Sequence, residues 1–384
     1  MRVGIDYRPA LVNREGIGRY ARELVRGLIE LKFDGNLGLF GYTLSPLRVP
    51  REELGIDGTR AELVRLRLPS RALPWMLNRI GRGVDDLVGG CSVYHHTTYS
   101  RLRVARAAEV VTIHDCAYLL GADYVSEESA QSMERAAREL VAHADRILVP
   151  TEFSGAEVVL HLGAFPGQIT VTGLGCDHIA RRLPADALAP RAPRRDPYLV
   201  TVARVDNRKN HLRMLWAFER LVREGLPHRW VIAGPPGHGA DSFERALSDS
   251  PARERITWKR FVPETELAPL IAGADLFLFA SLHEGFGLPP LESMVCGTPV
   301  LTSCVAAMPE VCGDAAWFVE PTEEDAIFEG MLRLLREPEL RSDLALRGRQ
   351  RARRFTWKET ARKTLAAYRM AAEGKEQPKL RRTL

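Results

Sequence analysis

The most restrictive feature of the sequence is a short apolar run that leads through a glycine-containing loop into a helix start. The run covers residues 274–280, and residues 281–292 then read Ser-Leu-His-Glu-Gly-Phe-Gly-Leu-Pro-Pro-Leu-Glu. A run this short and apolar is typical of a buried parallel strand, and prolines fit the first turn of a helix, where a missing N–H costs nothing. The stretch therefore predicts a strand, a loop and a helix of an α/β fold.

Two carboxylates flank this predicted loop. Glu284 lies on the loop, and Glu292 lies in the first turns of the helix. Gly285 and Gly287 let the backbone approach a ligand, and the amides of a helix start favour an anion such as a diphosphate. Because a carboxylate accepts hydrogen bonds from vicinal hydroxyls, one glutamate can hold a ribose and the other a sugar. The stretch indicates a sugar-nucleotide site, although a glycine turn and a glutamate near a helix start also occur for structural reasons.

Two cations follow a second predicted strand. Residues 198–203 form an apolar run, Arg204 ends it, and Lys209 lies at the next helix start. We expect the two side chains to converge on one crevice, where they would neutralise the charge of a diphosphate leaving group. The structural alternative is a pair of surface charges around a turn.

The composition excludes several classes of protein. The chain has 384 residues, enough for two domains, and its net charge of +5 is too small to indicate a nucleic-acid partner. Six cysteines are scattered without Cys-x-x-Cys spacing, which is typical of reduced thiols in a cytosolic protein. Without a signal peptide or a membrane-spanning run, we expect a cytoplasmic protein with no metal centre.

The combination of Glu284 and Glu292, seven residues apart and enclosing Gly-Phe-Gly-Leu-Pro, resembles the signature of retaining glycosyltransferases of family four. The resemblance implies the GT-B architecture, an α/β fold with two Rossmann-like domains facing across a cleft and a C-terminal helix crossing back to the first domain. It also implies transfer of a sugar from a nucleoside diphosphate to a hydroxyl with retained configuration. The sequence is similar to bacterial mannosyltransferases of surface polysaccharide and glycolipid assembly, so GDP-mannose is the expected donor.

The resemblance assigns roles to individual residues. His114 and Glu284 would act on the donor sugar as the catalytic pair, and Glu292 would hold the ribose. The remaining donor-binding residues are the closing-loop glycines Gly16 and Gly18, the phosphate ligands Arg204 and Lys209, Arg260 and Val262 near the nucleobase, and Gly285, Phe286, Gly287 and Leu288 of the central motif. For Gly16 and Gly18, a plain turn before a helix explains the glycines as well.

No metal or other cofactor is expected. Asp-x-Asp does not occur in the sequence. The diphosphate would instead be held by Arg204, Lys209 and helix-start amides. No side chain need attack the sugar, because the departing phosphate can itself take the acceptor proton.

The chain divides into four predicted parts. Residues 1–179 form an acceptor-binding Rossmann-like domain, and 198–360 form a nucleotide-sugar-binding one. Residues 180–197, rich in Arg, Pro and Ala, read as the linker, and 361–384 form a helix and tail that pack on the first domain.

The stretch 65–82 is basic and amphipathic. It contains five arginines and no acidic residue, and Leu73, Met76, Leu77 and Ile80 fall on one helical face near Trp75. This pattern is typical of an element that touches an anionic membrane surface, here the inner face of the plasma membrane. A helix packed on the core with a solvated arginine face is the alternative.

Rival functions of two classes remain open, one enzymatic and one non-catalytic. The same architecture serves sugar-nucleotide epimerases and phosphorylases, of which the latter need a lysine-bound pyridoxal cofactor. A non-catalytic nucleotide-sugar-binding scaffold would keep the fold without turnover. The sequence does not fix the acceptor, which could be a glycan or a lipid-linked sugar, nor the oligomeric state.

Overall fold

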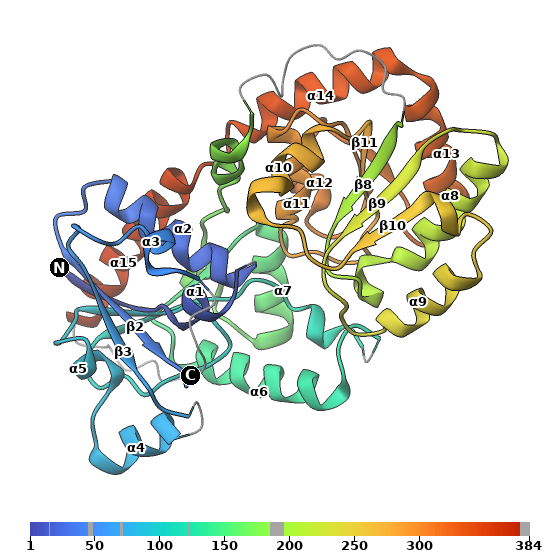
Figure 1. Cartoon of the computed structure of the whole chain (residues 1–384). Coiled ribbons are helices and arrows are strands. Elements are labelled where there is room, and N and C mark those ends of the chain that lie inside the picture. Colours follow the sequence, from blue (N-terminus) through green and yellow to red (C-terminus); the bar gives the residue numbers. More distant parts are fainter. Residues whose placement is uncertain (15, 45–48, 70–71, 122, 185–195, 377–384) are drawn as a thin grey trace. The chain divides into compact units, whose positions relative to one another are not determined.

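The structure is a computed structural model that describes the chain except residues 15, 45–48, 70–71, 122, 185–195 and 377–384. The chain forms two compact units (Figure 1). The N-terminal unit contains Met1–Cys116, Gln131–Gly175 and Trp357–Leu384, and the C-terminal unit contains Ala117–Ala130 and Cys176–Thr356. Residues 117–130 thus belong to the C-terminal unit, although they lie within the span 1–179 that the sequence assigns to the first domain. Most of the predicted linker, residues 185–195, lies outside the described residues.

The N-terminal unit is built on a parallel sheet of seven strands among the described residues, in the order β3-β2-β1-β4-β5-β6-β7. The strands are β1 (Arg2–Asp6), β2 (Asn36–Tyr42), β3 (Ala61–Leu66), β4 (Val93–His96), β5 (Ala108–Thr112), β6 (Arg146–Val149) and β7 (Ile169–Val171). The strand order reverses between β1 and β4, which pair in parallel. Ligands of such sheets bind beyond the carboxyl ends of the strands at this reversal.

Helices connect these strands. They are α1 (Arg8–Val12), α2 (Ile17–Glu30), α3 (Arg51–Leu54), α4 (Ala72–Ile80), α5 (Val84–Leu87), α6 (Glu127–His143) and α7 (Glu152–Leu162), with short 3-10 turns at Ala117–Leu119 and Pro166–Gln168. None of the helices in the described parts of the chain is long and apolar enough to cross a bilayer.

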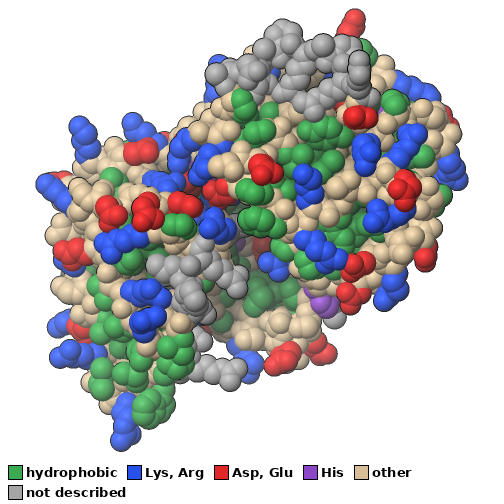
Figure 2. Space-filling view, in the orientation of Figure 1, with side chains coloured by type: hydrophobic (Ala, Val, Ile, Leu, Met, Phe, Trp, Pro, Cys, Tyr) green, Lys and Arg blue, Asp and Glu red, His purple; other side chains and the backbone are tan. Residues whose placement is uncertain are grey.

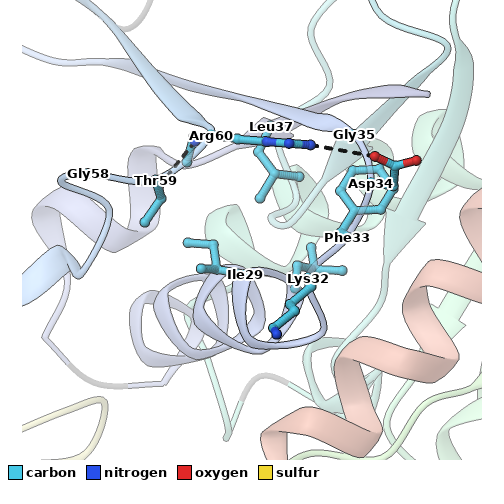
Figure 3. Close-up of a pocket in the computed structure, with 11 residues that line it drawn as sticks. Ile29, Lys32, Phe33, Asp34, Gly35, Leu37, Gly58, Thr59 and Arg60 are labelled. Atoms are coloured by element: carbon cyan, nitrogen blue, oxygen red, sulfur yellow. Dashed lines mark hydrogen bonds and ion pairs between the residues drawn. The ribbon is translucent and has the colours of Figure 1, made fainter.

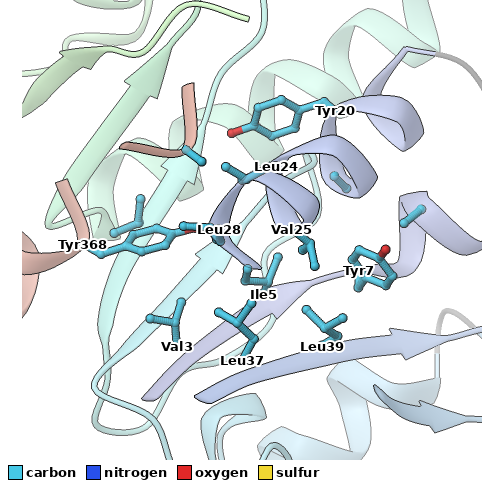
Figure 4. Close-up of a cluster of buried hydrophobic side chains, with 14 of the residues drawn as sticks. Val3, Ile5, Tyr7, Tyr20, Leu24, Val25, Leu28, Leu37, Leu39 and Tyr368 are labelled. Atoms are coloured by element: carbon cyan, nitrogen blue, oxygen red, sulfur yellow. The ribbon is translucent and has the colours of Figure 1, made fainter. Parts of the chain in front are cut away.

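The C-terminal helix α15 (Trp357–Glu376) packs on the N-terminal unit, as the sequence predicts, and begins four residues before 361. Gly27 of α2 allows the close approach, because a Cβ there would lie 2.7 Å from the carbonyl oxygen of Trp357. Figure 4 shows Tyr368 of α15 beside Leu28 in the core, where Ile5 and Leu37 of neighbouring strands are also buried. The helix therefore belongs to the core of this unit.

The C-terminal unit has a six-stranded parallel sheet among the described residues, ordered β10-β9-β8-β11-β12-β13. The strands are β8 (Tyr198–Val202), β9 (Arg229–Ala233), β10 (Ile256–Lys259), β11 (Leu276–Phe279), β12 (Val300–Ser303) and β13 (Trp317–Val319). The strand order reverses between β8 and β11, where Leu276 pairs with Leu199. The predicted strand at 274–280 is thus confirmed as β11, at the centre of the sheet.

Helices also connect the strands of this sheet. They are α8 (His211–Arg223), α9 (Ala240–Asp249), α10 (Glu264–Ala272), α11 (Leu288–Val295), α12 (Met308–Cys312), α13 (Glu324–Arg336) and α14 (Pro338–Ala352), with 3-10 turns at Asp177–Arg182, Asn207–Lys209 and Arg253–Arg255. Two parallel-sheet α/β units confirm the predicted fold class.

The predicted amphipathic stretch 65–82 forms the end of β3 and helix α4. Leu73 and Leu77 are buried in a core cluster with Phe40, whereas Met76 and Ile80 are exposed. The sequence predicts that these four side chains fall on one helical face, and the structure divides them into a buried pair, Leu73 and Leu77, and an exposed pair, Met76 and Ile80, because the two pairs differ on average by about 60° around the helix.

Candidate functional site

The carboxylate of Glu284 lies at the carboxyl end of β11 and is buried among cations. Arg208 donates to Glu284 Oε2 at 3.2 Å and to the carbonyl oxygen of His283 at 2.7 Å. Lys209 forms an ion pair with Glu284 Oε1, and the hydroxyl of Ser281 donates to the same oxygen at 2.6 Å. Burial alone would raise the pKa of Glu284, but Lys209 and Arg208 outweigh burial and lower the pKa to about 2. The carboxylate is therefore ionised at neutral pH.

The local sequence explains why the cations meet this carboxylate. Asp206 caps the 3-10 turn Asn207–Lys209 by accepting from the amide of Lys209 at 3.0 Å. Asn210 follows in a left-handed conformation, and its side-chain amide donates to the carbonyl oxygens of Ala280 and Pro321 at 2.9 and 2.7 Å. These bonds tie the turn after β8 to the end of β11.

Lys209 is held in a poorly hydrated position. Its side chain is 12% exposed, and its Nζ lies 5.1 Å from the ring centroid of Phe279. Burial is the main cause that lowers the pKa of Lys209, the neighbouring charge of Arg208 lowers it further, and Glu284 and Asp206 oppose both. A second anion near Nζ would offset the burial in the same way as Glu284 does.

Arg204 is not joined to this cluster. It follows β8 and is exposed, and its stem lies along Gly237, where a Cβ would come within 2.6 Å of Arg204 Cδ. Among the described residues, no hydrogen bond or ion pair links Arg204 to Lys209 or Glu284. The structure therefore places Lys209 beside Glu284, whereas the exposed guanidinium of Arg204 contacts neither residue in the described part of the chain.

Glu292 lies on α11 and is 2% exposed. His178 Nε2 lies 2.8 Å from Glu292 Oε1, so the imidazole and the carboxylate form a hydrogen bond. His178 comes from the 3-10 turn Asp177–Arg182, 114 positions before Glu292. Like Arg208, it contacts a predicted site residue and was not itself predicted.

The glycine loop before α11 has a steric reason of its own. Gly287 has φ +89°, which strains any other residue, and a Cβ there would lie 2.0 Å from Met308 Cε, so a larger residue would also require Met308 to move. The ring of Phe286 is 5% exposed and packs edge-on against Phe355 with ring centroids 5.8 Å apart. Only the backbone of Phe286 can therefore face a ligand. Leu288 is the first residue of α11, and Gly285 precedes Phe286 on the loop.

The predicted nucleobase residues follow β10. The Arg260 guanidinium stacks on the ring of Trp258, 4.4 Å from its centroid, and forms an ion pair with Glu244. Phe261 is 66% exposed, and Val262 is half-buried. These two contacts fix the position of the Arg260 guanidinium and leave some of its five N–H donors unused by Glu244.

In the N-terminal unit, His114 follows β5 and its ring is fixed on two sides. Tyr20 packs edge-on against it with ring centroids 4.8 Å apart, and His114 Nε2 lies 3.4 Å from the carbonyl oxygen of Thr97. Burial lowers the pKa of His114, and Asp115 and the Thr97 carbonyl partly oppose this shift. The imidazole is therefore neutral at pH 7 and able to donate or accept a hydrogen bond.

The other polar residues near this sheet edge have structural roles. His95 lies between the hydroxyls of Tyr368 and Thr112, both at 2.7 Å, and burial lowers its pKa to about 3. Gly18 allows α1 and α2 to meet, because a Cβ there would lie 2.0 Å from the carbonyl oxygen of Asn13. Gly16 precedes α2 with φ +54° and has open space around its Cα.

The N-terminal unit also has a pocket of about 640 Å³ near the amino ends of its strands, at the other end of the sheet from His114. Figure 3 shows it between the end of α2 and the segments that lead into β2 and β3, with Lys32 and Arg60 on its wall. Arg60 pairs there with Asp34. None of the predicted site residues lines it, and it lies at the amino ends of the strands. Among the described residues, no group of His, Cys, Asp or Glu side chains could hold a metal ion.

Comparisons with known proteins agree with this architecture. Residues 188–351 match the family described as Glycosyl transferases group 1, and residues 15–175 match the family described as Glycosyl transferase 4-like domain. The chain is 29% identical over 370 residues to the O-antigen chain mannosyltransferase B of Escherichia coli. The aligned region covers 92% of this chain and 96% of that relative.

Solved structures share the fold at low sequence identity. Sucrose-phosphate synthase from Thermosynechococcus elongatus superposes with a TM-score of 0.77 at 18% identity, covering 97% of this chain and 100% of that one. HepE of Anabaena, in complex with UDP and glucose, gives 0.72 at 17% identity, covering 95% and 99%. The two family matches together span most of the sequence and coincide with two parallel-sheet domains, so this chain belongs to the glycosyltransferases of the GT-B architecture.

Proposed function

We propose that this glycosyltransferase moves mannose from GDP-mannose to a hydroxyl of a glycan or lipid-linked acceptor, with retained anomeric configuration and without a metal ion. The observation that carries the proposal is the partly buried pair of cations Arg208 and Lys209, which the buried carboxylate of Glu284 holds at a strand end. Two cations in a poorly hydrated crevice suit a nucleoside diphosphate, whose negative charge grows as the sugar bond breaks. Similarity to an O-antigen mannosyltransferase supports mannose as the sugar.

We assign the donor groups as follows. Lys209 binds the diphosphate together with Arg204 and the amides before α11, and Glu292 accepts hydrogen bonds from the ribose. Glu284 orients the sugar, and His114, neutral at pH 7, hydrogen-bonds its hydroxyls. Arg208 joins the phosphate ligands, because its guanidinium shares the carboxylate of Glu284 with Lys209.

The chemistry needs positioning and charge stabilisation rather than a protein nucleophile. The bond between the anomeric carbon and the phosphate oxygen breaks, the acceptor oxygen bonds to the anomeric carbon on the same face, and the leaving phosphate takes the acceptor proton. Fixed cations stabilise the phosphate charge that develops in the transition state. In this scheme the diphosphate is held by Lys209 and Arg208, so no divalent metal is required.

We further propose that the enzyme works in the cytoplasm at the inner face of the plasma membrane. A lipid-linked acceptor is confined to that surface, and the sequence 65–82 carries five arginines and no acidic residue. The soluble glycan acceptor is the alternative outcome.

A nucleotide panel tests the donor assignment. Thermal unfolding of the purified protein is measured with GDP, UDP, ADP, GDP-mannose and UDP-glucose, because a ligand that binds only the folded state raises the apparent stability. We expect GDP-mannose and GDP to give the largest shifts in the presence of a chelator. Equal shifts for all nucleotides, or a need for divalent metal, would contradict the proposal.

Turnover then separates transfer from its rivals. Release of GDP from GDP-mannose in the presence of a mannose-terminated acceptor, with an α-linked product by NMR, is the expected result. Conversion of GDP-mannose to another sugar nucleotide would instead show an epimerase, and binding without any turnover would show a scaffold.

A further inference from the structure

Helix α4 presents apolar side chains on two faces. Leu73 and Leu77 fill the core cluster under the helix and are 2% and 1% exposed. On the outer face, Trp75 is 65% exposed, Ile80 is 59% exposed and Met76 is 37% exposed. The inner row explains why the helix folds onto the sheet, but no packing in the described residues explains the outer row.

The outer row forms part of a surface patch. Figure 2, in the orientation of Figure 1, shows hydrophobic side chains gathered where α4 lies, at the lower left, with basic side chains beside them. Single exposed apolar residues are normal on soluble proteins, whereas a contiguous group that includes a tryptophan marks an interaction surface. We call Trp75, Met76 and Ile80 the α4 patch.

The charge around the α4 patch is positive. Arg79 of α4 and Arg82, two residues after the helix, are exposed, and neither forms an ion pair with a carboxylate among the described residues. The Arg79 guanidinium lies 5.9 Å from the ring centroid of Trp75. No acidic residue occurs between Glu62 and Asp85 in the sequence.

The acidic residues that follow α4 do not cancel this charge. Asp85 is buried and accepts hydrogen bonds from the backbone amides of Ala105, Arg106 and Ala107. Asp86 forms an ion pair with Arg106. The arginines beside the α4 patch therefore keep a net positive charge at the surface.

We propose that the α4 patch, together with Arg79 and Arg82, forms a docking surface for an anionic lipid bilayer. Tryptophan prefers the level of the headgroups, aliphatic side chains enter the acyl boundary, and arginines pair with anionic headgroups. A protein partner for this helix would have to place acidic groups around an apolar contact area. An anionic leaflet presents negatively charged headgroups over its whole surface, with an apolar layer below them. The inference rests on the proposed function at one point: a lipid-linked acceptor would bring the enzyme to a membrane.

Vesicle binding tests the docking surface directly. The full chain is sedimented with vesicles of pure phosphatidylcholine and with vesicles that contain phosphatidylglycerol at about one part in three. We expect binding to the anionic vesicles that decreases with added salt, since headgroup attraction is screened over a Debye length. Brominated lipids should quench part of the tryptophan fluorescence, and that quenched part should be missing in Trp75→Phe.

Charge variants with a matched control give the size of the effect. Replacing Arg79 and Arg82 by Ser should lower the partition coefficient roughly 30-fold, as two contributions of about 1 kcal/mol each predict. The control replaces two exposed arginines outside the patch, Arg135 and Arg245, and should leave partitioning within about twofold of wild type. Trp75→Ala should weaken binding, whereas Leu160→Ser, at a side chain 77% exposed on α7, should not.

Several outcomes would overturn the inference. These are equal sedimentation with both vesicle types, sedimentation with neither, equal effects of the patch and control variants, or quenching that persists in Trp75→Phe. Self-association that Trp75→Ala abolishes would show that a second copy covers the patch. Nucleotide shifts measured on the same variants keep the two proposals apart, because loss of lipid binding should leave the GDP shift unchanged. A wild type that binds vesicles but no nucleotide would refute only the proposed function.

Discussion

Replacing Glu284 by Gln tests the central electrostatic feature of the donor site. The substitution keeps the size of the side chain but removes the charge that Lys209 and Arg208 share. The pKa of Glu284 is lowered from its usual 4.5 to about 2, which corresponds to a stabilisation of the folded state of about 3 kcal/mol at neutral pH. The side chain is 8% exposed, so solvent screening reduces this value little. We expect the variant to be less stable by an amount of this order.

The stability difference should depend on pH with a definite sign. Because the folded-state pKa of Glu284 lies below the unfolded value, its contribution is fully present above about pH 4.5 and is lost as the pH falls toward about 2. Urea unfolding of wild type and Glu284→Gln should therefore differ most near neutral pH, and the difference should shrink below about pH 4.5. Glu323→Gln, at an exposed glutamate of the same unit, should show no such difference.

The same substitution should strengthen binding of free GDP. A phosphate that contacts Lys209 would lie about 5 Å from the Glu284 carboxylate, and two unit charges at that distance repel by about 3 kcal/mol at an effective dielectric constant of 20. The cations lose some order when their partner carboxylate is removed, so the net gain is on the order of tenfold in affinity. Transfer from GDP-mannose should nevertheless be lost, because the sugar is no longer oriented.

Isothermal titration with GDP decides between these expectations. Weaker or unchanged GDP binding in Glu284→Gln would mean that the phosphates do not occupy the cations that Glu284 neutralises. If Glu323→Gln raised the affinity for GDP by the same factor, the overall charge of the protein would explain the effect. Either result would refute the proposed exchange of partners at Lys209 and Arg208.

Three further substitutions test the other parts of the site. Lys209→Ala should weaken GDP binding by about 2 to 5 kcal/mol in a titration, the range for removing one partner of a buried charge pair; unchanged affinity would remove Lys209 from the site. Glu292→Ala should weaken binding of GDP but not of pyrophosphate, because only GDP has a ribose, and equal losses would refute its ribose role. Gly287→Ala should lower the unfolding free energy by more than Gly225→Ala does, where φ is +79° but a Cβ would meet nothing within 4 Å; equal losses in urea unfolding would show that the contact with Met308 is relieved cheaply.

The central strand, loop and helix could be predicted because their signals are local. The apolar run before Ser281 forms the central strand β11, and the prolines after Leu288 lie in the first turn of α11. Each of these signals acts within a few residues of the chain. The two-domain fold follows from repeating such units, and the C-terminal helix was predicted to return to the first domain.

The partners of the site residues could not be predicted, because they depend on long-range packing. Arg208 stands beside Lys209 in the sequence, but only the cap at Asp206 and the bonds of Asn210 turn its side chain toward Glu284. His178 meets Glu292 from a distant 3-10 turn. An alternation or spacing rule describes one element at a time and does not show which two elements will meet.

Local sequence patterns also did not show to which of the two units residues 117–130 belong. Residues 117–130 follow the fifth strand of the N-terminal unit and carry no linker signal. They join the C-terminal unit through contacts such as the hydrogen bond from Asn207 Nδ2 to the carbonyl oxygen of Asp123, at 3.0 Å. Such a segment can be recognised only once the contacts of both units are known.

The contacts of Glu284 connect the stability of the empty site with its proposed chemistry. Two partly buried cations without a partner would be costly, because charges that lose contact with water lose solvation free energy. Glu284 supplies the missing charge in the absence of a ligand, and a diphosphate carries more negative charge than one carboxylate. Donor binding would then transfer Lys209 and Arg208 from the carboxylate to the phosphates, so that Oε2 and the remaining acceptor capacity of Oε1, which keeps its hydrogen bond from Ser281, could accept from sugar hydroxyls. A residue with this double role must fail in two separable ways when it is neutralised, in folding stability and in sugar orientation, while the affinity for the nucleotide alone increases.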